Sequence, residues 1–68
     1  MLNPVEKTLL YVMQVLNISK ESSFGIMLLL KDNEVGQRKL LEYMKNSDPK
    51  SLTETVIISK VEEIISEV

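Results

Sequence analysis

The apolar stretch Phe24–Leu30 constrains this chain more than any other feature of its sequence. On a helix, which turns about 100° per residue, its side chains point in every direction instead of gathering on one face. A helix that is apolar all round has to be covered on all sides, so we expect the segments before and after it to surround it. The sequence therefore predicts an all-α fold, a small bundle of about four helices around a central apolar helix.

The segment before this stretch predicts an amphipathic helix. Asn3 is the expected N-cap, Pro4 the first helical residue, and Glu6 lies in the first turn, where the helix dipole favours a carboxylate. One apolar face recurs at spacings of three and four residues, formed by Val5, Leu9, Val12, Met13 and Leu16. Three further large side chains fall off this face: Leu10, Tyr11 and Ile18. They are either scattered surface residues or contacts to another chain or a later helix, and the pattern leaves both interpretations open.

Two polar segments, residues 17–23 and 31–33, are predicted to separate the first three helices. Ser22 or Ser23 is the expected cap of the central helix, which would end near residue 31. Asp32 or Asn33 is the expected cap of a third helix over residues 34–46. Gly25, inside the central helix, costs about 1 kcal/mol relative to alanine and marks either a close helix crossing or a frayed first turn.

The third and fourth predicted helices are both amphipathic. The third has one side formed by Gly36, Gln37, Leu40, Leu41, Tyr43 and Met44, and a charged side formed by Arg38, Lys39, Glu42 and Lys45. The fourth begins either at Pro49, capped by Asp48, or at Leu52, capped by Ser51 with Glu54 completing a capping box. Its apolar stripe is Ile57, Ile58, Val61, Ile64, Ile65 and Val68.

Composition narrows the chemistry that this chain can perform. Its 68 residues predict a single domain over residues 1–68, and the initial Met1 favours a complete chain over an excised piece. The sequence contains no cysteine and no histidine, which leaves no thiol nucleophile and no Cys/His zinc site. Glu63 and Glu67 lie four residues apart, but an exposed acidic face explains them better than a cation site. We therefore expect no enzyme, no catalytic residues, no metal and no cofactor.

The sequence also bears on location and on charged partners. Its N-terminal segment lacks the pattern of a secretory signal, and no stretch has the roughly 18 apolar residues that span a bilayer. A net charge of −2 gives no electrostatic reason to bind nucleic acid or an anionic membrane. We expect a soluble, cytoplasmic protein.

The function favoured by these patterns is a protein-interaction or regulatory module that self-associates, with a homodimer as the concrete expectation. At 44% hydrophobic residues, this small chain has more apolar surface than one small core readily buries. The candidate interface residues are Leu10, Tyr11, Ile18, Leu52, Val56, Ile57, Val61, Ile64 and Val68. The spacing Ile57–Val61–Ile64–Val68 suits a two-helix seam, but a stripe that closes the chain's own core is the simpler interpretation of these residues.

The alternative is a small DNA-binding regulator of the helix-turn-helix kind. The central helix, the turn 31–33 and the third helix have suitable lengths, and the third helix would present Arg38, Lys39 and Lys45 to DNA. Glu34 and Glu42 lie among these cations, so the basic footprint typical of such proteins is missing. Nucleic-acid binding is therefore the second interpretation.

Overall fold

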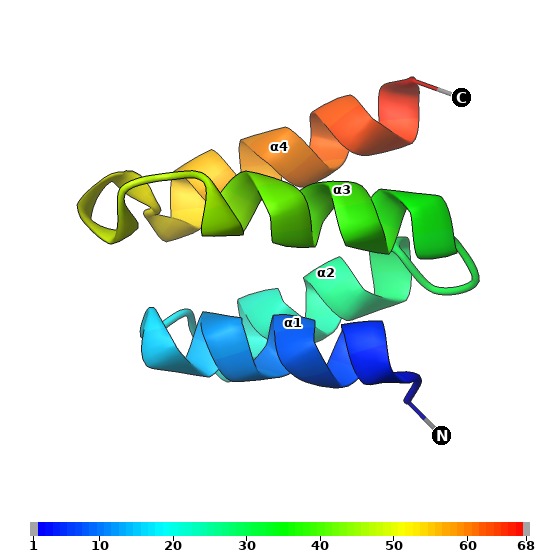
Figure 1. The fold of residues 1–68 in the computed structure, drawn as a ribbon, viewed down its shortest axis with the longest axis horizontal. Helices are drawn as coiled ribbons and strands as arrows, with labels where there is room; N and C mark the ends of the chain where they lie inside the picture. Colours follow the sequence, from blue (N-terminus) through cyan, green and yellow to red (C-terminus); the bar gives the residue numbers. More distant parts are fainter. Residues whose placement is uncertain (1, 68) are drawn as a thin grey trace.

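The structure, a computed structural model, describes residues 2–67 (Figure 1). Every secondary-structure element in this range is a helix. The elements are α1 (Pro4–Val15), α2 (Lys20–Leu29), α3 (Glu34–Lys45), the short 3₁₀ helix η1 (Pro49–Ser51) and α4 (Glu54–Ser66). α1 packs against α3 and α2, and α4 packs against the same two helices. The predicted all-α bundle of four helices is confirmed.

Side-chain caps set the starts of α1 and α3, as the sequence predicted. The Asn3 side chain accepts a hydrogen bond from the Glu6 N–H (2.8 Å), and the Glu6 carboxylate accepts one from the Asn3 N–H (2.9 Å). Asn33 caps α3 by accepting a hydrogen bond from the Gly36 N–H at 2.9 Å. Each bond satisfies a backbone donor that has no partner within the first turn.

The starts of α2 and α4 differ from the expected ones. Ser19 caps α2, accepting from the Ser22 N–H at 3.2 Å, so this helix begins before the expected caps Ser22 and Ser23. The chain makes η1 after Asp48 and then starts α4 with Thr53 as its cap. The expected capping box of Ser51 and Glu54 is wrong, because Ser51 belongs to η1 and its hydroxyl donates to the Asp48 carbonyl (2.8 Å).

The core is shared by all four helices and is not centred on one of them. Its buried members are Leu9, Met13, Ile18, Ile26, Met27, Leu30, Leu40, Met44, Leu52, Ile57, Val61 and Ile64. The expectation that 24–30 is covered on every face is wrong, since Phe24 is 72% exposed and Leu28 69%. The reason is geometric: α2 packs on α1 and α4, and its opposite side faces outward.

Ile18 is buried because of the way α1 ends. Asn17 adopts a left-handed conformation with φ of 61°. The Ile18 N–H then donates to the Met13 carbonyl (3.0 Å), and the Asn17 N–H donates to the Gln14 carbonyl (3.1 Å). This pair of bonds is a Schellman motif, which turns the chain back and packs the residue after the left-handed position against the helix. Ile18 therefore joins the core instead of lying off the face of α1.

One buried polar side chain, Gln37, connects three helices. It is 1% exposed, and its amide nitrogen donates to the Leu30 carbonyl at the end of α2 (2.8 Å) and to the Glu6 carboxylate (3.4 Å). Its amide oxygen accepts from the Asn3 side chain (3.3 Å). Among residues 2–67, no buried side-chain nitrogen or oxygen lacks a hydrogen-bond partner. Gln37 thus holds the start of α1 and the end of α2 against α3.

Candidate interaction surface

Most of the candidate interface residues expected from the sequence lie inside the fold. Ile57 and Val61 are fully buried, Ile64 is 4% exposed and Leu52 5%, while Val56 packs against the edge of the core. The stripe on α4 therefore closes the core of its own chain and is not available to another chain in this structure. Val68, its last member, lies outside the described residues.

The other candidates separate into covered and open positions. Ile18 is in the core, and Leu10 is partly buried against it. Tyr11 is 66% exposed and is the open member of the set. The structure thus divides the expected interface: the α4 residues face inward, while on α1 Leu10 is partly buried and Tyr11 is exposed.

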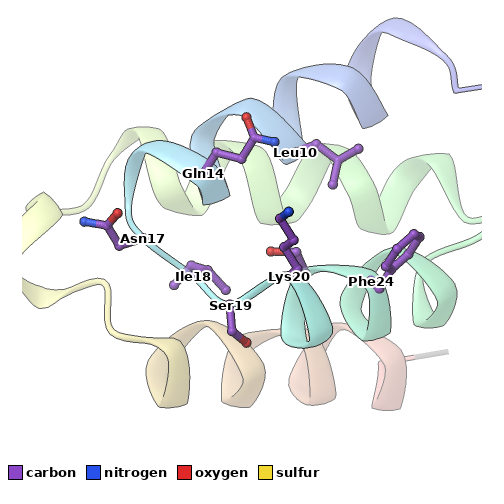
Figure 2. A pocket seen from close by; sticks show the side chains of 8 residues that line it. Leu10, Gln14, Asn17, Ile18, Ser19, Lys20 and Phe24 are labelled. Carbon is purple, nitrogen blue, oxygen red and sulfur yellow. The ribbon is translucent and has the colours of Figure 1, made fainter.

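A surface groove of about 510 Å³ runs between α1 and α2. Figure 2 shows Leu10 on the α1 side and Phe24 on the α2 side, with Lys20 reaching between them towards α1. The groove is lined by Leu10, Gln14, Asn17, Ile18, Ser19, Lys20, Ser23 and Phe24. We call this feature the α1–α2 groove. Its one charged lining residue is the cation Lys20, so it suits an apolar side chain accompanied by a carboxylate.

The outward side of α2 extends this apolar surface. Phe24 and Leu28 lie one helical turn apart on the same side, and Leu29 is 56% exposed beside them. We call Phe24, Leu28 and Leu29 the α2 outer face. Sequence reasoning missed it, because every position in 24–30 is apolar or glycine and no periodicity separates the covered positions from the open ones.

A hydrogen bond links Ser19, one of the residues that line the groove, to the first residue of α4. The Ser19 N–H donates to the Glu54 carboxylate at 3.0 Å. This bond lowers the pKa of Glu54 below its ordinary value, with a smaller lowering from the Ser22 hydroxyl and a small opposing effect of desolvation. The loop between α1 and α2 is therefore held against α4 by a charge-assisted bond.

The cations of the DNA-binding alternative are not gathered into one basic site. Arg38 pairs with Glu34 on α3 (2.8 Å), and Lys39 pairs with Glu67 beyond the end of α4 (3.5 Å). Lys45 is exposed in the last turn of α3. With two of its three cations already beside carboxylates, this helix offers little net positive charge to a phosphate backbone.

Two structural features are absent from residues 2–67. No group of three or more Asp, Glu, His or Cys side chains is arranged to hold a metal ion. In the same part of the chain, no helix combines the length and the apolar character needed to cross a bilayer.

Comparisons with known proteins assign no family to this chain. No protein-family model, no curated protein and no solved structure matches it. What the chain does is therefore inferred from its own surface, in particular from the α1–α2 groove and the α2 outer face.

Proposed function

We propose that this chain is a non-enzymatic protein-interaction module that self-associates through α1 and α2. The surface differs from the one that the sequence favoured: it keeps Leu10 and Tyr11, and it replaces the stripe on α4 with the α2 outer face. The cytoplasmic location expected from the sequence remains part of this proposal.

One observation carries the proposal: most of the exposed apolar side chains lie in the first two helices or just before them. Eight large hydrophobic residues are exposed among residues 2–67, and six of them precede α3: Leu2, Tyr11, Val15, Phe24, Leu28 and Leu29. Single exposed apolar residues are ordinary, but Phe24 also lines the α1–α2 groove and Leu28 lies one helical turn from it, and an exposed apolar surface beside such a groove is typical of a surface that binds another protein. Aromatic residues such as Phe24 and Tyr11 are also enriched at the centres of interfaces.

The character of the groove supports binding over catalysis. Of its eight lining residues, only Lys20 carries a titratable side chain. A general acid–base or nucleophilic mechanism needs a second positioned group within hydrogen-bond reach of the first. Apolar walls with a single cation at the rim supply contact area and one charge partner, which are the requirements of recognition.

The test is the mass in solution from about 10 µM to about 1 mM, measured by light scattering behind a sizing column. We expect wild type to form a dimer as concentration rises, and the variant Phe24→Glu/Leu28→Glu to remain a monomer with unchanged helicity. Val35→Glu is the matched control, because Val35 is 65% exposed but lies on α3. It should dimerise as wild type does. A wild type that stays monomeric to about 1 mM would overturn the proposal.

A further inference from the structure

We propose that the α1–α2 groove binds a small amphiphilic carboxylate, that is, an aliphatic chain that ends in one carboxylate group. This inference goes beyond the proposed function and does not rest on it, because a single copy of the chain contains the whole groove. Three features of the groove carry it: an open hydroxyl, a free cation and apolar side chains.

Ser23 is a buried polar residue whose hydroxyl the fold leaves without a hydrogen bond. It is 7% exposed and lines the groove from α2. In this part of the chain no fully buried side-chain oxygen lacks a partner, so the Ser23 oxygen is open to the groove. Other hydroxyls within residues 2–67 do donate to a backbone carbonyl of the turn before them, namely those of Thr8, Ser47, Ser51 and Ser66.

The open hydroxyl of Ser23 indicates where the polar group of a ligand lies. Buried polar groups in proteins are nearly always hydrogen-bonded, so this hydroxyl takes its partner from whatever enters the groove. A ligand oxygen that reaches Ser23 replaces the hydrogen bond that water supplies in the absence of a ligand.

Lys20 gives the groove its only charge. It is exposed and takes part in no ion pair within residues 2–67. It lies three residues before Ser23 on α2, which places both on the same side of the helix. Figure 2 shows the Lys20 side chain extending towards α1, where Gln14 lines the groove. An ammonium, a hydroxyl and a side-chain amide can all donate hydrogen bonds, so this part of the groove suits an anionic oxygen group.

A single cation favours a ligand with a single negative charge. The Glu54 carboxylate at the start of α2 accepts from the Ser19 N–H and does not line the groove, which leaves Lys20 as the charge partner there. A doubly charged phosphate would keep one charge unbalanced, and the net charge of −2 of the chain opposes its approach. One carboxylate group matches the charge of the site.

The rest of the groove is apolar and large enough for a short aliphatic chain. Leu10 from α1, Ile18 from the turn and Phe24 from α2 line it. Its volume of about 510 Å³ lies within the range of about 300–1,000 Å³ that is usual for small-molecule sites. An aliphatic chain covered by these side chains leaves water favourably, while its carboxylate remains beside Lys20 and Ser23.

The first experiment compares octanoate with two molecules of the same chain length, octanol and octylammonium. Amide chemical shifts of the ¹⁵N-labelled protein are followed by NMR during each titration. We expect saturable shifts in residues 17–24 with octanoate, at a Kd of about 1 mM. Octanol and octylammonium should bind at least about fivefold more weakly, because the first lacks the charge and the second reverses it.

Two results of this titration would overturn the inference. If octanoate gives no saturable shift up to about 10 mM, the groove is not a ligand site. If octanol binds as tightly as octanoate, the carboxylate is not recognised.

The second experiment changes the two groups assigned to the carboxylate. Lys20→Gln should weaken octanoate binding about fivefold and leave octanol binding unchanged. Ser23→Ala should weaken octanoate binding about threefold without lowering Tm, because the hydroxyl makes no hydrogen bond within the chain. Lys45→Gln removes the same charge on α3 and should bind octanoate as wild type does. Octanoate affinity that is unchanged in both Lys20→Gln and Ser23→Ala would refute the assigned position of the carboxylate.

Leu28→Glu separates ligand binding from self-association. Leu28 belongs to the α2 outer face and does not line the groove, so this variant should bind octanoate as wild type does even as a monomer. Loss of octanoate binding in a monomeric, fully helical Leu28→Glu would overturn the inference that one copy contains the site. A wild type that stays monomeric and binds octanoate supports this inference and overturns the proposed function, whereas a wild type that dimerises and does not bind has the opposite meaning.

Discussion

Replacing Gln37 tests how much of the fold depends on one buried polar side chain. Gln37→Met keeps a similar length but removes three hydrogen bonds, of which the one to the Leu30 carbonyl is short at 2.8 Å and the others are 3.3 and 3.4 Å. The Leu30 carbonyl still accepts from the Asn33 N–H at 3.0 Å, so it is not left without a partner. At about 0.5–1.5 kcal/mol for a good bond and less for the two long ones, we expect a loss of about 2 kcal/mol.

That loss is large for a chain of this size, since small domains are stable by only about 0.05–0.15 kcal/mol per residue. Urea denaturation followed by circular dichroism measures it, and the m value should stay that of wild type because the fold is unchanged. A loss below about 0.5 kcal/mol would refute the view that these bonds hold α1 and α2 against α3.

Gln37→Glu separates hydrogen bonding from packing. Near neutral pH it places a carboxylate in the core beside Glu6 and the Leu30 carbonyl, so burial and like charge should raise its folded pKa above the unfolded value of about 4.3. A raised carboxyl pKa costs stability above the unfolded pKa, and the cost should disappear as pH falls towards that value. We therefore expect Gln37→Glu to be less stable than Gln37→Met at pH about 7 and to recover towards pH about 4.5. Gln14→Glu, at an exposed position of α1, should show no such recovery.

Two further predictions concern α2 and the loop before it. Gly25→Ala should stabilise the monomer by about 1 kcal/mol, which raises Tm by roughly 4–8 °C in dilute solution, because the added methyl group meets nothing within 4 Å; a lower Tm would contradict the open space at this position. Glu54→Gln should lower stability near neutral pH, because the pKa of Glu54 is lowered chiefly by the Ser19 N–H. A lowered carboxyl pKa contributes stability that is present above the unfolded pKa and is lost as pH falls through the folded one. The difference between Glu54→Gln and wild type in thermal melts should therefore close in acid, and a constant difference across pH would refute this cause.

The sequence predicted those elements whose signals are local. α1 and α3 were found because Asn3 and Asn33 cap them and because their apolar positions repeat at helical spacing. The start of α2 is not predicted correctly, because Ser19, Ser22 and Ser23 are equally good caps by residue type. The Ser19 N–H donates to Glu54, 35 residues away along the chain, and a contact of that range leaves no local signal.

The candidate surface was less predictable for a different reason. Periodicity reports which side of a helix is covered only where apolar and polar residues alternate, and the stretch 24–30 does not alternate. The burial of Ile18 had a usable signal, because asparagine followed by an apolar residue at a helix end is typical of a Schellman motif. At residues 16–18, this rule predicts that Ile18 packs against α1, which places it in the core and not in the candidate interface.

The exposure of Phe24 and Leu28 bears on the strength of the proposed dimer. Full burial of one such side chain contributes about 1.5–3 kcal/mol, and a two-fold dimer covers four of them. Four side chains therefore give at most about 6–12 kcal/mol, which falls within the range of about 4–15 kcal/mol for the translational and rotational freedom lost on association. The gain and the cost are of similar size, which predicts a weak dimer. Its population should follow protein concentration over the range up to about 1 mM, as expected for a weak two-helix contact.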